Sequence, residues 1–290
     1  MNKIVTCVFI LSIGLIQACS KSNNGSGSGG NTAPKVTSAD LIKTYKANGT
    51  ASGYRLDAGI VQIPLSGTNK SFNYSNNPTG TPWTETFGTP TVSAFSGATY
   101  TIGFTNNLGG QTLAISRYYQ INTSSWSVMG DYYSAATLSI PGTGTAAIPA
   151  QAVAQTPTLI LANLPITYGD STNQTCNSKL TFSATLTGFP FPLPGEIKQE
   201  IKTTNNVFAW GNLKVRGYTD SMPTVVQRFV TSIKTNYFLS GSPAPTALLN
   251  SLGVTDGQIV NNTAYRFFVP GKGLVMTVNA DGSATVTTGL

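Results

Sequence analysis

Apolar and polar residues alternate along most of the chain, with the period of two that is typical of β-strands. Tyr100, Ile102 and Phe104, for example, alternate with two threonines and a glycine. Further alternating or short apolar runs stand at 60–65, 113–121, 158–162 and 180–186. Gly, Asn and Pro separate them, as expected of turns. The pattern predicts an all-β, mainly antiparallel and β-sandwich-like fold, with one large or two packed β-domains and one or two short helices.

Two segments have the end signals of short helices. The first, 39–47, follows hydroxyl side chains that can cap a helix and precedes Asn48-Gly49. The second, 245–252, begins with a proline and is followed by Gly253. Residues 225–238 also have apolar residues at helical spacing, but their many Val, Thr, Ile and aromatic residues favour a strand.

Charged and uncharged side chains alternate through 196–202, a pattern that predicts a strand with one solvated face. On that face Glu196 and Glu200 alternate with Lys198 and Lys202. A paired-carboxylate acid/base site at the two glutamates is the alternative interpretation. We favour the charge ladder because neighbouring lysines stabilise ordinary ionised carboxylates.

Two hairpins are predicted near the C-terminus, each with glycine in its turn. One covers 267–278 and turns at 270–273; the other covers 275–286 and turns at 279–282, which we interpret as a type I′ turn. Upstream, 141–157 is uncharged and rich in Ala, Gly, Thr and Pro. This bridge is the best candidate for a domain boundary.

Composition excludes several chemistries. The chain contains no histidine, which removes Ser-His-Asp and Cys-His catalysis and His-ligated metal sites. Only 9% of its residues are charged, against roughly 25% in ordinary globular proteins. The net charge of +7 comes from scattered Lys and Arg residues, so nucleic acid is not an expected partner. Neither a cofactor nor a metal is predicted.

The first nineteen residues have the pattern of an export signal. Lys3 precedes an apolar run over 4–16 that is too short to span a bilayer. The run leads into Ile16-Gln17-Ala18-Cys19, which resembles the lipobox of bacterial lipoproteins. The resemblance implies cleavage before Cys19 and lipidation of Cys19. A lipid bilayer is therefore an expected partner, and the expected location is the outer membrane, with the periplasmic or cell-surface face left open.

The segment after Cys19 consists mainly of Gly, Ser and Asn and predicts a flexible tether. Cys7 belongs to the leader, so Cys176 is left alone and has no partner for a disulfide. The predicted organisation has four parts: a lipoprotein signal peptide (1–18), the Gly/Ser/Asn tether (19–36), an N-terminal β-region (37–150) and a C-terminal β-region (151–290).

A family resemblance covers about residues 60–240. Leu164–Ser171 reads Leu-Pro-Ile-Thr-Tyr-Gly-Asp-Ser and is followed by a Thr/Ser-rich strand at 181–187, Trp210-Gly-Asn-Leu213 and Val225–Val230. Upstream stands Gly67–Ser75, with its Gly-x-Asn-x-x-aromatic pattern. These segments resemble uncharacterised secreted and surface proteins of the Bacteroidota. The resemblance implies a β-sandwich-like envelope protein and supplies no catalytic residue.

Aromatic and carboxylate residues are the remaining candidates for a site. A glycosidase without histidine needs two carboxylates about 5–10 Å apart, and Glu85 with Asp131 is one such pair; capping and turn roles are favoured instead. A sugar-stacking platform is the candidate role of the aromatic residues Trp83, Trp126, Tyr118 and Tyr133, although packing in the core is favoured.

Ser171 and Ser221 each follow an aspartate, in Asp-Ser-Thr and Asp-Ser-Met. These short sequences resemble O-glycosylation acceptors of Bacteroidota envelope proteins and predict exposed positions. We expect an envelope-anchored lipoprotein that serves as a non-catalytic binding or structural surface module, with a glycan or an envelope protein as ligand. The alternatives are a His-free, glycosidase-like hydrolase and a fimbria-like assembly subunit.

Overall fold

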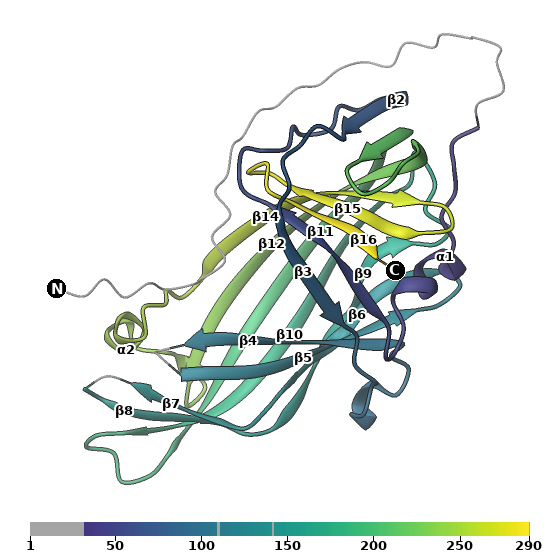
Figure 1. Ribbon diagram of the computed structural model, residues 1–290. Coiled ribbons are helices and arrows are strands. Elements are labelled where there is room, and N and C mark those ends of the chain that lie inside the picture. Colours follow the sequence, from purple (N-terminus) through teal and green to yellow (C-terminus); the bar gives the residue numbers. More distant parts are fainter. Residues whose placement is uncertain (1–31, 109–110, 141, 290) are drawn as a thin grey trace.

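The computed structural model describes residues 32–289, except 109, 110 and 141. Strands dominate these residues, and sixteen of them belong to one sheet (Figure 1). The first eight are β1 (Thr50–Leu56), β2 (Gly67–Tyr74), β3 (Thr81–Thr86), β4 (Tyr100–Leu108), β5 (Gln111–Ile121), β6 (Ser125–Tyr133), β7 (Ala136–Ile140) and β8 (Gly144–Ile148). The others are β9 (Gln151–Asn163), β10 (Ser171–Leu186), β11 (Leu193–Val215), β12 (Met222–Leu239), β13 (Ser242–Pro243), β14 (Gln258–Val269), β15 (Gly273–Asn279) and β16 (Ala284–Gly289). The all-β prediction is confirmed.

Along the sheet the strands follow the order β3-β1-β16-β15-β14-β12-β11-β10-β9-β6-β5-β4. Every neighbouring pair on this path is antiparallel, whereas β2 lies parallel to β11. The β7–β8 hairpin joins the sheet through β8, which pairs with β10. Since β1 pairs with β16 and β6 with β9, strands from both halves of the sequence share this sheet.

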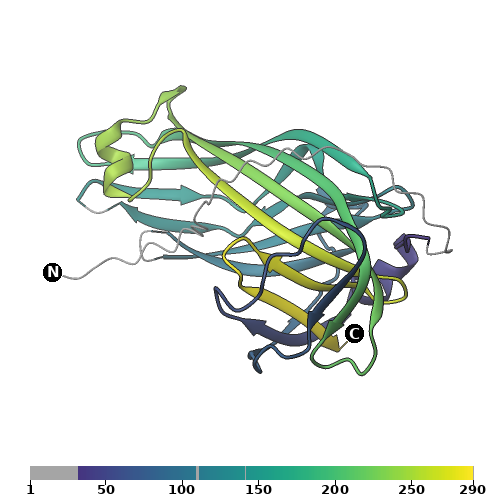
Figure 2. The ribbon, with the colours of Figure 1, turned by 90° about the horizontal axis from the view of Figure 1, so that it is seen from above.

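The sheet twists and curls until it is nearly closed, as expected of long strands with a strong right-handed twist. Its longest member, β11, has 23 residues. Figure 2 shows the consequence: the layer of β4, β5, β6 and β9 lies across the long strands β10, β11, β12 and β14. Two facing layers of one sheet thus give the sandwich-like arrangement.

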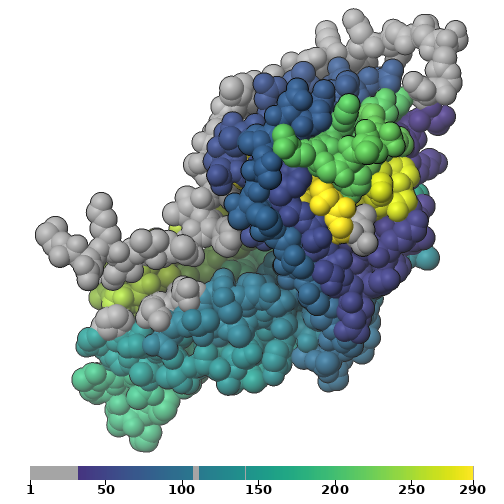
Figure 3. All heavy atoms as spheres, viewed as in Figure 1, coloured from purple at the N-terminus to yellow at the C-terminus, as the bar shows by residue number. Residues whose placement is uncertain are grey.

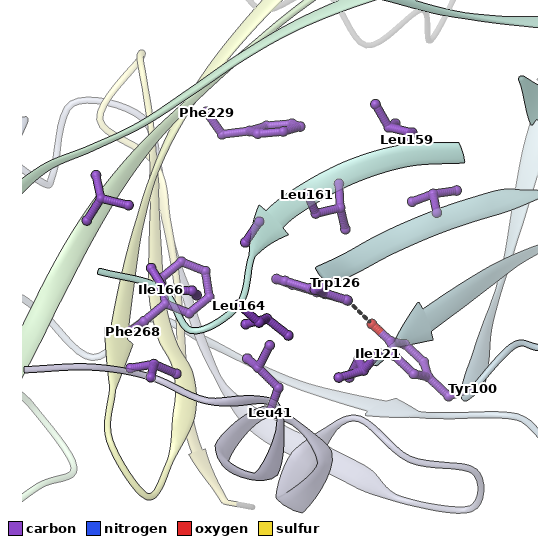
Figure 4. Packing of buried hydrophobic residues seen from close by; sticks show 14 of the residues in the cluster. Leu41, Tyr100, Ile121, Trp126, Leu159, Leu161, Leu164, Ile166, Phe229 and Phe268 are labelled. Carbon is purple, nitrogen blue, oxygen red and sulfur yellow. Dashed lines mark hydrogen bonds between the residues drawn. The ribbon is translucent and has the colours of Figure 1, made fainter. Parts of the chain in front are cut away.

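The main core lies between these layers and is rich in aromatic side chains (Figure 4). Trp126 of β6 donates its indole Nε1–H to the Tyr100 hydroxyl of β4 at 3.0 Å. The Tyr100 ring stacks on Tyr119, with ring centroids 4.7 Å apart. Phe229 of β12 and Phe268 of β14 belong to the same cluster from the opposite layer. Buried aromatic pairs of this kind give the core a fixed geometry as well as a large apolar area.

Helix α1 (Ser38–Thr44) closes one end of this core with its buried Leu41. The Asp40 carboxylate accepts the backbone N–H of Thr37 at 2.8 Å and that of Gly271, in the β14–β15 turn, also at 2.8 Å. Burial raises the pKa of Asp40, but the hydrogen bonds from Thr37 and Gly271 outweigh it, so that the pKa is lowered overall. The aspartate therefore both caps the helix and fastens it to the sheet.

Most of the predicted elements are confirmed. The first helix begins one residue earlier and ends three residues earlier than expected, and the second is α2 (Thr246–Ser251). The ambiguous segment 225–238 lies within strand β12. Both C-terminal hairpins form, as β14–β15 and β15–β16. A 3-10 turn, η1 (Ser93–Phe95), was not predicted.

Three expectations were wrong. Residues 60–65 form no strand; Pro64 has no N–H to donate, and the Val61 N–H bonds the Gly282 carbonyl instead. Strands were expected to resume only at 158, after the bridge at 141–157, but 144–148 form β8 and 151–157 begin β9; the division into two β-regions stays a prediction. In the turn at 279–282 only Gly282 has a positive φ, +79°, which excludes a type I′ turn and fits a type I turn followed by a left-handed glycine.

Candidate functional site

The four candidate stacking aromatics do not form one exposed platform. Trp126 and Tyr118 are 5% and 3% exposed, and so they pack inside the protein. Trp83 is half-buried and donates its Nε1–H to the Val286 carbonyl at 3.2 Å. Tyr133 is half-buried against a separate apolar cluster. Large aromatic side chains at strand positions thus serve mainly for packing here, as expected of Trp and Tyr in a β-rich core.

Glu85 and Asp131, the candidate carboxylate pair, have different surroundings. Both oxygens of the buried Asp131 carboxylate accept hydrogen bonds from Arg117, at 2.8 and 2.9 Å. Burial raises the pKa of Glu85, on the edge strand β3, and the nearby Arg55 opposes that rise. Asp131 is thus the partner of a guanidinium, which is a structural arrangement rather than that of a general acid.

The charge ladder at 196–202 is present in β11. Glu196 forms ion pairs with Lys179 at 3.1 Å and with Lys198 at 2.9 Å, and Glu200 forms one with Lys202 at 2.9 Å. These hydrogen bonds and charges lower the pKa of Glu196 and the pKa of Glu200. Neither glutamate therefore has the raised pKa of a catalytic acid.

The remaining sequence candidates lie apart from one another. Ser171, at the start of β10, and Ser221, just before β12, are both exposed, as an acceptor position requires. Cys176 is buried, and burial raises its pKa to about 11. Cys19 lies outside the described residues. Within those residues, no group of three or more acidic or cysteine side chains gathers at a metal-binding distance, and no helix has the length and apolarity to cross a bilayer.

The most distinctive local feature is an interrupted ladder between β9 and β10. Only one register pair, Asn177↔Thr156, joins these antiparallel strands. On one side of it, the Gln174 side chain accepts the Ile160 N–H at 2.9 Å and donates to the Thr158 carbonyl at 2.6 Å. Pro157 lies next to the pair and has no N–H for a ladder. A side-chain amide thus replaces the backbone pairing that the two strands lack.

A second glutamine does the same on the other side of the single pair. The Gln151 side chain of β9 donates to the Thr181 carbonyl at 2.7 Å and accepts the Thr181 N–H at 3.1 Å. Between Gln151 and Thr156 the two strands have no register pair. The two glutamines therefore act as spacers that hold the strands apart while satisfying their backbone groups.

An open cleft of about 610 Å³ lies at this gap. We call it the β9–β10 cleft; its walls are Ala152, Val153, Ala154, Thr156, Asn177, Ser178, Lys179, Lys198, Gln199, Glu200 and Asn236. Most of these side chains carry amide, hydroxyl, ammonium or carboxylate groups. Asn177, Lys179 and Lys198 are exposed, so that their polar groups are accessible to a ligand.

The inner side of β9 is held by polar side chains from the facing layer. Asn205 of β11 donates to the Ile160 carbonyl at 3.2 Å, and Gln227 of β12 donates to the Leu161 carbonyl at 3.0 Å. Arg266 of β14 also reaches Leu161, and its guanidinium lies 3.9 Å from the Phe229 ring centroid. Burial lowers the pKa of Arg266 to about 10. This network holds β9 at Ile160 and Leu161, just beyond the part of the strand that lines the cleft.

Sequence reasoning missed this cleft. One signal was available, because Pro157 falls within a strand that is central to the sheet, a position that proline rarely occupies. The two glutamines gave no signal, since their partners are backbone groups 14 to 30 residues away in the sequence.

The chain was compared with known protein families, curated proteins and solved structures. No family, curated protein or solved structure matches the chain. The fold and the cleft define an all-β protein with a polar surface cleft, and the chemistry of that cleft is the basis for assigning a role.

Proposed function

We propose that the chain is a lipid-anchored outer-membrane protein, acylated at Cys19, whose folded part is a non-catalytic module that binds carbohydrate in the β9–β10 cleft. The lining of that cleft is the observation that carries the proposal. A saccharide presents many hydroxyl groups, and amide and hydroxyl side chains provide the matching donors and acceptors. A cleft of about 610 Å³ lies within the size range of small-molecule sites.

The charges of the cleft favour an acidic sugar. Lys179 and Lys198 line it directly, and both share the single carboxylate of Glu196. Each ammonium has three donors, so each keeps N–H groups for a ligand beyond its contact with Glu196. Glu200 is the one carboxylate in the lining, and it is paired with Lys202. A uronic acid or another saccharide with a carboxylate or sulfate group meets this arrangement best.

A glycan array with the mature chain tests the proposal, followed by calorimetry with any glycan retained. Replacing Lys179 or Lys198 by Met removes one cleft ammonium, and we expect the affinity for an acidic glycan to fall about 10-fold or more. Lys214→Met is the matched control, because Lys214 is an exposed lysine of the same strand β11 outside the cleft. Equal effects of Lys198→Met and Lys214→Met would contradict the assignment of this site.

Two further measurements test the rest of the proposal. Mass spectrometry of the protein isolated from its cell envelope is expected to find a chain that begins at an acylated Cys19. A retained residue 1 or an unmodified Cys19 would contradict the anchor. Incubation with bound glycans is expected to release no reducing ends, since a hydrolase needs a second carboxylate near Glu200; release would favour the hydrolase instead.

A further inference from the structure

The turn between β10 and β11 exposes two phenylalanines at its tip. Phe189 is 54% exposed and Phe191 is 74% exposed. Pro190 lies between them and Pro192 follows, so the backbone of the tip has few accessible conformations. Two large apolar side chains on such a restrained, solvent-facing turn are unusual for a surface with no partner. We call residues 187–192 the Phe tip.

Three segments make up the end of the molecule around the Phe tip, and none of them contains a charged residue; the Lys198 ammonium lies at their border, 4.4 Å from the Phe238 ring centroid. Residues 132–149, 180–195 and 238–255 contain no Asp, Glu, Lys or Arg. They meet at this end: the Thr187 N–H donates to Thr143 of the β7–β8 turn at 2.8 Å, and the Ser240 N–H donates to Pro194 at 2.7 Å. Helix α2 covers the same end, and its Leu249 packs in a cluster with Ala184 of β10 and Leu239 of β12.

The opposite end of the long strands carries charged residues. The β11–β12 turn contains Arg216 and Asp220, and the β14–β15 turn contains Lys272. Helix α1, with Asp40 and Lys43, lies there as well (Figure 1). Charge is therefore excluded from one end of the molecule rather than being low everywhere, which points to an apolar environment at the uncharged end.

The shape of this end favours a lipid surface over a protein groove. Figure 3 shows the β10–β11 turn, in teal-green, projecting at the lower left of the molecule as a convex protrusion. A projecting tip with aromatic side chains can enter the boundary between headgroups and acyl chains, where apolar surface is buried without a shaped partner. An apolar groove of about 550 Å³ lies further back, between 135–137, 147–149 and 181–183, and the two phenylalanines are not part of it.

The length of the chain before the described residues is compatible with this contact. Val36 pairs with Ile166, and nearby Gly169 bonds Val207 of β11, so the described chain begins near the level of Val207. From Val207 to the start of β11 at Leu193 the strand covers about 46 Å. Cys19 lies 13 residues before residue 32, where the described chain begins, and such a length spans at most roughly 45 Å. This is enough to reach a bilayer that runs alongside the long strands, so that the anchor at Cys19 and the Phe tip can contact the same leaflet.

We propose that the Phe tip inserts Phe189 and Phe191 into the membrane interface as a second attachment, with the long strands lying along the bilayer. This goes beyond the proposed function and shares with it only the anchor at Cys19. Two attachments restrict the tilt of the sheet relative to the bilayer, whereas a single tether does not. The range of orientations of the β9–β10 cleft relative to the membrane would then be narrower.

A site-specific fluorophore tests this contact in the full mature chain. Phe191→Cys is labelled with an environment-sensitive dye, and the protein is reconstituted into vesicles of phosphatidylethanolamine and phosphatidylglycerol. Brominated acyl chains are expected to quench the dye about twofold or more, because an inserted tip lies ~5–10 Å deep. Ser221→Cys is the matched control, since it places the dye on the exposed turn at the other end of β11, where no quenching is expected.

The outcomes separate the tip from the anchor. The dye is also applied to the wild-type protein, which has no added cysteine. Because Cys176 is buried, any labelling there would come from an unmodified Cys19. That result would contradict the anchor and not the tip. A dye at position 191 that stays in a water-like environment while the protein floats with the vesicles overturns the proposal. A blue shift that grows with protein concentration in the absence of lipid also overturns it, in favour of a second copy of the chain.

Discussion

Gln151 and Gln174 lie on opposite strands of one interrupted ladder, and each bonds the backbone of the strand that carries the other. Gln151 of β9 bonds both backbone groups of Thr181, while Gln174 of β10 bonds Thr158 and Ile160. The single register pair of β9 and β10 lies between these two contacts. Side-chain hydrogen bonds therefore bridge the two strands on both sides of their single register pair.

Removing the Gln174 amide is expected to destabilise the protein. Gln174→Ala leaves the Thr158 carbonyl and the Ile160 N–H without partners in a partly buried place, which costs about 1–3 kcal/mol. Urea unfolding followed by circular dichroism measures the change. Gln258→Ala, at an exposed position of β14, is the control and is expected to change stability by less than about 0.5 kcal/mol. Equal stabilities of the two variants would show that the Gln174 contacts are not formed.

The outer face of β11 gives a prediction about acid pH. The folded-state pKa values of Glu196 and Glu200 lie below 4.5, because lysines bond and attract the ionised forms. Their contribution to stability is thus present above pH 4.5 and is lost as the pH falls through the lowered pKa values. NMR titration is expected to show the Glu196 pKa rising toward 4.5 in Lys198→Met, while Lys214→Met leaves it unchanged. A Glu196 pKa that is the same in the wild-type protein and in Lys198→Met would contradict the ion pair.

Periodicity in the sequence was sufficient for the strands that have one solvated face. Residues 196–202 were placed in a strand because side-chain polarity repeats at the period of the pleat, whereas 225–238 were placed in one because of their Val, Thr, Ile and aromatic content, against a helical spacing of apolar residues. The same reasoning failed at 60–65, where a short apolar run binds the β15–β16 turn through backbone groups. Composition also misled at 144–157, because small uncharged residues form strands when neighbours provide the pairing, and such context overrides local propensity.

The candidate site was less accessible to sequence reasoning. For Trp126, weighed as a stacking residue, core packing was the favoured interpretation, and the side chain is buried in the core. The β9–β10 cleft depends on two side-chain contacts between segments distant in sequence, and neither glutamine belongs to a recognisable motif. The three uncharged segments around the Phe tip, in contrast, are visible in the sequence, but only the fold shows that they lie together at one end of the molecule.

The ion pair between the partly exposed Arg117 and the buried Asp131 is expected to be strongly coupled. Asp131→Ala leaves the Arg117 guanidinium without its bidentate acceptor and is expected to cost about 1.5–3 kcal/mol, as for hydrogen bonds to charged groups. The double variant with Arg117→Ala should cost less than the sum of the single changes, and a double-mutant cycle in urea measures the difference. Asp57→Ala, at an exposed position, is the control. Strict additivity of the two single changes would contradict the pair.

Cys176 is expected to be unreactive in the folded protein. Its side chain is 0% exposed and burial raises its pKa to about 11, so that only ~0.1% is thiolate at pH 8. An exposed cysteine with an ordinary pKa is about 20–25% thiolate at that pH. Ionisation alone therefore makes Cys176 roughly 200-fold slower to react than the cysteine in Ser221→Cys, and lack of access adds to this. Alkylation at pH 8, with peptide mapping to identify the modified residue, measures both rates, and urea should bring them together. Similar rates in the folded protein would show that the β10 strand opens far more readily than its burial implies.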